Sequence, residues 1–107
     1  MRLKVQLPRT LEEGLAGQSP IKYPMLFDFP GKPTFRTMWM HGMLEPIDIV
    51  WMDEERRIVK IHHHCPPGDK HTYSSGTSVK YAIEFPAGYA KKHKLAAGDV
   101  FEWDAPK

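Results

Sequence analysis

The sequence predicts an α+β domain that is mainly β, with a small curled antiparallel sheet or a β-barrel-like arrangement and two short helices. Ten prolines and eight glycines interrupt a chain of only 107 residues, which favours short strands and turns over long helices. Several short segments alternate apolar and polar side chains, as half-buried strands do. Closing such a sheet would also remove its exposed edges.

Length and composition favour one soluble domain over residues 1–107. The hydrophobic fraction of 41%, with a formal net charge of only +2, argues against a disordered chain and against nucleic acid as a partner. No apolar run is long enough to span a membrane, so no membrane partner is expected. The chain as written looks cytoplasmic, and it would be exported if a signal peptide had been removed. Its single cysteine cannot form an internal disulfide.

The N-terminal part of the chain shows one strand pattern and one helix signal. Leu3–Leu7 alternates apolar and polar residues, and Pro8 ends this expected strand. Thr10–Glu13 matches the capping box Thr-x-x-Glu, in which two side chains satisfy free backbone N–H groups. We therefore expect a short helix to about Ala16, closed by Gly17 in a left-handed conformation.

The middle of the chain predicts four strands, over residues 25–29, 34–43, 47–52 and 58–65. Residues 34–43 carry aromatic and methionine side chains on both faces, which favours a central strand. A charged turn between the last two strands predicts a β-hairpin.

The C-terminal part begins with a long loop from Cys65 to Gly76. Residues 79–85 alternate cleanly and predict a strand with one apolar face, in which Lys80, Ala82 and Glu84 share the opposite face. A second short helix is expected over residues 87–94, and a last strand over residues 100–103.

Four segments together resemble a known family. They are Pro24–Phe29, Phe35–Met40 with Glu45–Ile49, Tyr73–Ser75, and Tyr81–Gly88 followed by Leu95–Asp99. In order and spacing the chain resembles the bacterial and archaeal domain of unknown function 192 family from Thr10 to Phe101. The resemblance implies a compact β-barrel-like domain with a few short helices, no established activity, and relatives that are often exported or membrane-anchored. The family pattern continues Trp-Met with Lys-Asn-Thr, where this chain has His41-Gly42-Met43.

Asp48 is the first candidate functional residue, because it lies between Ile47 and Ile49 in an expected strand. A buried carboxylate without a partner is costly. One interpretation is structural, with Asp48 paired to Arg36 or Arg57 or accepting backbone N–H bonds. The other is a pocket acid that binds a ligand.

Aromatic side chains beside hydroxyl groups predict a shallow pocket, because ligand pockets combine apolar walls with a few polar groups. The leading hypothesis is a non-enzymatic small-ligand-binding or accessory domain, without cofactor, that could hold a sugar or another amphipathic molecule. Its expected ligand-binding residues are Trp39, Met40, His41, Asp48, Tyr73, Ser74 and Ser75.

The alternative is a small metal- or cysteine-dependent enzyme that uses His63, Cys65 and His41 or His71, with Asp48 as acid or base. In a regular strand His63 and Cys65 would point inward, and the neighbouring histidines would face solvent. The spacing fits no standard zinc motif, so no metal ligand or catalytic residue is assigned and the balance leans against an enzyme. A third hypothesis is a purely structural partner module with an exposed apolar patch.

Overall fold

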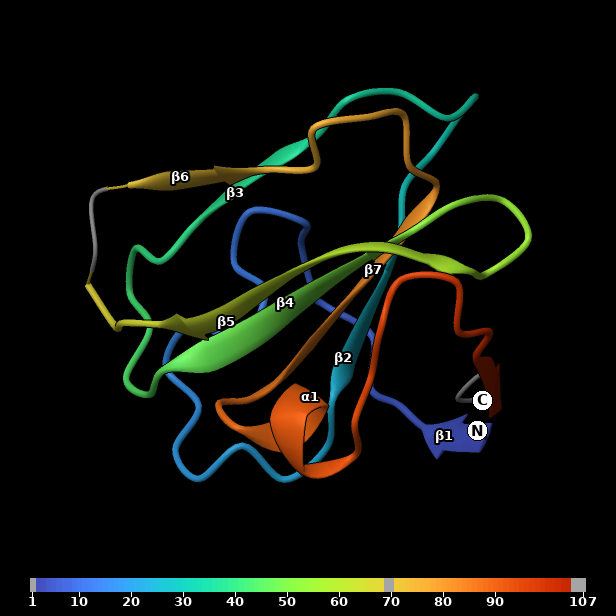
Figure 1. The fold of residues 1–107 in the computed structure, drawn as a ribbon. Helices are drawn as coiled ribbons and strands as arrows, with labels where there is room; N and C mark the ends of the chain where they lie inside the picture. Colours follow the sequence, from blue (N-terminus) through green and yellow to red (C-terminus); the bar gives the residue numbers. More distant parts are fainter. Residues whose placement is uncertain (1, 69–70, 105–107) are drawn as a thin grey trace.

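The computed structural model describes residues 2–68 and 71–104, and a four-stranded antiparallel sheet forms its centre (Figure 1). The strand order is β2 (Met25–Asp28), β7 (Tyr81–Pro86), β4 (Ile47–Met52) and β5 (Ile58–Cys65). β7 therefore lies between β2 and β4, although the three strands are far apart in the sequence.

Two smaller sheets flank this centre. β3 (Thr37–Trp39) pairs antiparallel with β6 (Thr72–Ser74), and β1 (Arg2–Lys4) pairs parallel with β8 (Glu102–Asp104). Figure 1 shows the β3–β6 pair on one side of the central sheet and β1 with β8 on another. The mainly β, antiparallel character is confirmed. The strands of residues 2–68 and 71–104 form three separate sheets, so the expected closure into a barrel is not found.

Apolar clusters cover both faces of the central sheet. Phe27, Ile49 and Trp51 belong to the cluster on one face, and Leu26, Val50 and Ile83 to the cluster on the other. Each large apolar side chain contributes roughly 1.5–3 kcal/mol when it is fully buried. Because both faces are covered, every residue of β4 is buried.

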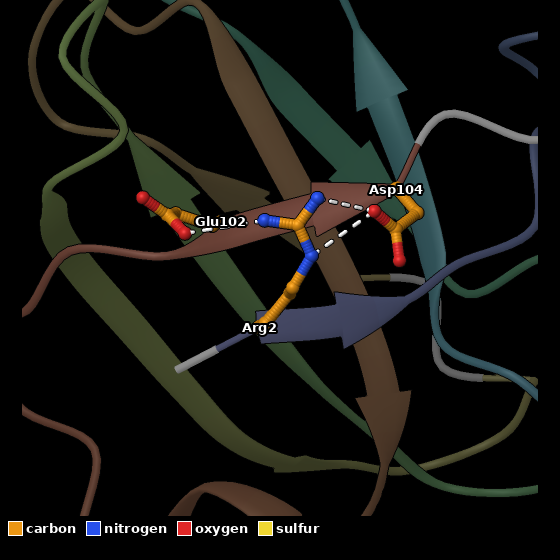
Figure 2. Close-up of polar contacts among 3 residues, drawn as sticks. All are labelled: Arg2, Glu102 and Asp104. Atoms are coloured by element: carbon orange, nitrogen blue, oxygen red, sulfur yellow. Dashed lines mark hydrogen bonds and ion pairs between the residues drawn. The ribbon is translucent and has the colours of Figure 1, made fainter.

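The β1–β8 pair brings residues 2–4 beside residues 102–104, and Figure 2 shows the polar contacts of Arg2 across it. Arg2 donates from Nε to Asp104 Oδ1 over 3.0 Å and from Nη1 to Glu102 Oε2 over 3.3 Å, and its Nη2 also pairs with Asp104. All three side chains are exposed, so solvent screens these ion pairs. The facing residues Leu3 and Trp103 are both buried, and we attribute most of the pairing energy to them.

One of the two expected helices is present in the described part of the chain. α1 (Tyr89–Lys92) lies within the predicted range 87–94. The helix expected from Thr10 to Ala16 is wrong, because the segment forms turns. The Glu13 N–H does donate to Thr10 Oγ1 over 3.1 Å, but Gly14 has a φ of 49°, which interrupts a right-handed helix.

Close packing explains the conformation at Gly14. A Cβ atom there would lie 3.1 Å from both Glu84 Oε1 and Phe27 Cζ. The turn segment of residues 10–17 therefore approaches the central sheet more closely than a helix with side chains could. This tertiary contact overrides the local capping signal.

Three of the strand predictions need correction. The strand expected over residues 34–43 is only three residues long, and it pairs with β6 alone instead of lying centrally. The apolar residues of this segment lie in different environments, since Met40 and Met43 are buried whereas Phe35 is 64% exposed. β1 ends at Lys4, and Leu7 is exposed. β7 is buried on both faces, so Glu84 does not face solvent.

No helix in the described residues has the length and apolar character needed to cross a lipid bilayer.

Candidate functional site: a cavity with a buried carboxyl group

A cavity of about 400 Å³ lies between the turn segment, the end of β2, residues 36–43 and β7. Its size falls within the range of small-molecule sites. Most of the wall is apolar, and is formed by Leu11, Leu15, Phe27, Phe29, Met38 and Met43. The polar side chains that line it are Glu12, Glu13, Arg36, Thr37, His41, Thr72 and Glu84.

Glu84 is the most unusual of these polar residues. The β-sheet register places it between Met25 of β2 and Ile49 of β4, on the face that the turn segment covers. Its side chain is buried, with only 4% of the residue exposed, and Oε1 has no hydrogen-bond partner. The carboxyl group accepts one hydrogen bond from the backbone N–H of Leu15.

Burial also changes the acidity of this group. Desolvation raises the pKa of Glu84 to about 8, and the bond from Leu15 lowers it by a smaller amount. Glu84 is therefore mostly protonated at neutral pH. A carboxyl group of this kind can donate a hydrogen bond when neutral, and it can bind a cation when ionised.

Arg36 brings a positive charge to the same cavity. Its guanidinium carbon lies 4.7 Å from the centroid of the Phe29 ring, and Nη2 donates to the carbonyl oxygen of Pro30 over 3.3 Å. The Nε atom is buried without a partner. Ser75 holds the backbone of Arg36, because its Oγ accepts the Arg36 N–H over 3.0 Å and its own N–H donates to Arg36 O over 2.8 Å.

Trp39 and His41 line the cavity and also a second, smaller hollow beside it. Their ring centroids are 5.0 Å apart with the planes inclined at 33°. Trp39 remains 53% exposed, so an apolar surface is available to solvent where the two hollows meet. These are the two sequence-predicted ligand-binding residues that line the cavity.

The other predicted pocket residues lie elsewhere. Met40 is fully buried in the core. Tyr73 packs edge-on against the His62 ring at a centroid distance of 5.3 Å, and Ser74 Oγ accepts the N–H of Gly76 over 3.1 Å. Within β6, Thr72 is the residue that lines the cavity, so the hydroxyl-rich segment mainly supports the wall around Arg36.

Asp48 is fully buried and does not line the cavity. Its Oδ1 accepts the backbone N–H of His64 over 2.9 Å, and its Oδ2 accepts those of Gly88 and Ala90 over 3.1 and 2.9 Å. The carboxylate thus connects β4 to the end of β5 and to the start of α1. Of the interpretations open at the sequence level, backbone hydrogen bonding is the one observed.

A β-bulge rearranges the histidine run. Ile49 faces His62 and Ile47 faces Cys65, so β5 carries one more residue than β4 between these pairs. His64 has a φ of 51°, and the Asp48 hydrogen bond holds it there. The bulge breaks the alternation of a regular strand, and the expectation that His63 points inward is wrong because His63 is exposed.

The histidine and cysteine side chains that the enzyme hypothesis requires therefore lie in different places. Cys65 is buried, and its Sγ donates to the carbonyl oxygen of His62 over 3.8 Å, whereas His41 lines the cavity and His71 is exposed. Over residues 2–68 and 71–104, no three His, Cys, Asp or Glu side chains are close enough together to hold a metal ion.

Sequence reasoning missed Glu84 and gave Arg36 only a structural role. Glu84 lies between Ile83 and Phe85, as Asp48 lies between Ile47 and Ile49. The same argument about a carboxyl group flanked by apolar residues could therefore have identified it. The clean alternation of residues 79–85 concealed it, because that pattern also fits a strand with one solvated face.

Comparison with known proteins finds a family whose members are similar to this chain. The sequence profile of DUF192, described as an uncharacterized ACR, matches residues 4–103. UPF0127 proteins from Thermococcus gammatolerans and Pyrococcus abyssi are 28% and 31% identical over 85% and 76% of this chain. The matched segments span 58% and 68% of those relatives, so the chain corresponds to part of their length.

Two crystal structures have the same fold. A protein from Sinorhizobium meliloti, provisionally described as a transcription regulator, is 30% identical with a TM-score of 0.84, and the match covers 90% of this chain and 78% of that one. A protein of unknown function from Novosphingobium aromaticivorans is 24% identical with a TM-score of 0.82, over 90% of this chain and 71% of that one.

Proposed function

This chain belongs to DUF192, a family of uncharacterised proteins, and we propose that it is a non-enzymatic binding domain whose cavity takes a small amphipathic ligand. The proposal rests mainly on one observation, which is that Oε1 of Glu84 has no hydrogen-bond partner in a largely apolar cavity. A buried polar atom without a partner costs about 1–3 kcal/mol. A ligand that hydrogen-bonds to this atom would offset that cost while its apolar part covers the wall.

The cavity combines a mostly apolar wall with a few polar side chains, which is the composition of a ligand-binding pocket. Among the described residues that line it there is no serine, cysteine or lysine. In the proposal, Trp39 and His41 contact the ligand at the opening and Glu84 contacts its polar group. Asp48 and Ser75 act indirectly, by holding the strands and the loop that shape the wall.

A fragment screen on the isotope-labelled full chain, followed by amide and indole NMR shifts, tests this proposal. Binding fragments should shift the signals of Thr37, Trp39 and Thr72, and the Trp39→Ala variant should lose most of the affinity. Phe35→Ala is the matched control, since Phe35 is an exposed aromatic residue of the same segment that lines neither hollow. The proposal is wrong if no fragment shifts these signals, or if Phe35→Ala weakens binding as much as Trp39→Ala.

A further inference from the structure

We propose that the cavity selects organic cations, in particular a primary ammonium group on an apolar body, and that Glu84 is the ionic partner of that ammonium group. This inference rests on the proposed function and specifies its ligand class. It starts from two features of the cavity, namely the excess of carboxyl groups and the unpartnered oxygen of Glu84.

Carboxyl groups outnumber guanidinium groups around the cavity. The turn segment contributes Glu12 and Glu13, and β7 contributes Glu84, whereas residues 36–43 contribute Arg36 and His41. Arg9 pairs with Glu13 across 3.0 Å on the outer side of the turn. The neighbours of Glu84 in the sheet, on β2 and β4, are apolar and supply no charge.

Part of the positive charge of Arg36 is stabilised within the chain, although its Nε atom is buried without a partner. Its guanidinium group lies over the Phe29 ring and is hydrogen-bonded to Pro30 O. No salt bridge joins Arg36 to Glu84 in the described structure. Glu84 therefore keeps an open acceptor position that a ligand cation can occupy.

An ammonium group matches this position in both charge and hydrogen bonding. It carries three N–H donors and no acceptor, so it can donate to Oε1 and pair with the ionised carboxyl group. Ion pairs gain strength in a desolvated site, and the aromatic faces of Trp39 and Phe27 can stabilise a cation further. The apolar wall then accommodates the hydrocarbon part of the ligand.

Binding of a cation must change the protonation of Glu84. The neutral carboxyl group loses its proton to solvent, and the carboxylate formed pairs with the ammonium group, which keeps its own protons. With a pKa of about 8 in the free protein, roughly 0.9 proton is released for each ligand bound at pH 7. A neutral ligand that accepts a hydrogen bond from the protonated carboxyl group would release none, and its affinity would fall as pH rises.

Isothermal titration calorimetry with 2-phenylethylamine, and with 2-phenylethanol as the neutral isostere, separates these cases. The amine should bind more tightly than the alcohol at pH 9, and the affinity for the amine should rise about tenfold from pH 7 to pH 9 as the ionised fraction of Glu84 rises. Titrations in two buffers of different ionisation enthalpy should show the released proton. Glu84→Gln should remove both the pH dependence and the proton release, whereas Trp39→Ala should weaken binding at every pH and keep the proton release.

The outcomes distinguish this inference from the function on which it rests. If 2-phenylethanol or phenylacetate binds as tightly as the amine, or if amine binding releases no proton, the cation selectivity is refuted while ligand binding stands. If the fragment screen and all three probes give no binding at the cavity, the proposed function fails too. The measurements on the unsubstituted protein decide the matter even if Glu84→Gln does not fold.

Discussion

Replacing Glu84 by glutamine should make the protein progressively more stable than the unsubstituted chain as pH rises. Glutamine has nearly the same shape and can still accept the Leu15 N–H, but it cannot ionise. Glu84 has a pKa of about 8 in the folded protein, against an ordinary value of 4.5. Between these two values the unfolded chain has lost the proton that the folded chain keeps, so the free energy of unfolding falls as pH increases.

The magnitude follows from the two pKa values. The difference between the folded-state and unfolded-state pKa values corresponds to a loss of about 5 kcal/mol in the free energy of unfolding of the unsubstituted protein. This loss is complete only above the folded-state pKa and vanishes below the unfolded-state pKa. Between pH 5 and pH 9 the difference between the variant and the unsubstituted protein should grow by about 4 kcal/mol. Opening of the cavity to water would reduce this value, so we expect between about half and all of it.

Urea unfolding of both proteins at several pH values measures the effect. Taking the difference between them cancels the titration of the histidines and surface groups that both proteins share. A difference that stays constant within about 0.5 kcal/mol from pH 5 to pH 9 would refute the argument, because it would mean that Glu84 ionises as easily in the folded protein as in the unfolded one.

Three further predictions concern the elements around the cavity. Asp48→Ala should lower the free energy of unfolding by about 3–5 kcal/mol, because three backbone N–H groups lose their acceptor. The control Asp28→Ala removes an exposed carboxylate and should cost less than about 1 kcal/mol. Equal losses in urea unfolding would contradict the role of Asp48 as a backbone acceptor. Gly14→Ala should destabilise the protein more than Gly17→Ala, since both glycines have a positive φ but only at Gly14 would an added Cβ meet neighbouring atoms. A lower melting temperature for Gly17→Ala than for Gly14→Ala would exclude such close packing at Gly14. His62 should titrate in NMR with a pKa below its ordinary value of 6.5, because burial disfavours the imidazolium. The hydrogen bond to Ser74 O raises the pKa by a smaller amount, and the charge of Lys60 lowers it further. The contribution of His62 to stability is therefore complete above pH 6.5 and is lost as pH falls through the lower folded-state pKa, and a midpoint at or above 6.5 would show this account to be wrong.

Local pattern in the sequence was sufficient for the central hairpin and for Asp48. The predicted ranges 47–52 and 58–65 coincide with β4 and β5, because apolar alternation and a charged turn are properties of neighbouring residues. Asp48 attracted notice because of its apolar neighbours, and it is indeed buried and fully hydrogen-bonded. Trp39 and His41 were also selected from the sequence, and both line the cavity.

Tertiary structure alone decided the rest. Periodicity shows which side chains share a face of a strand, but the element that covers this face comes from a distant part of the chain. The solvated face expected for Glu84 is covered by the turn segment, which cannot be helical because Gly14 packs against Glu84 and Phe27. One long-range contact therefore replaced a helix with turns, buried a carboxyl group and placed it against the cavity.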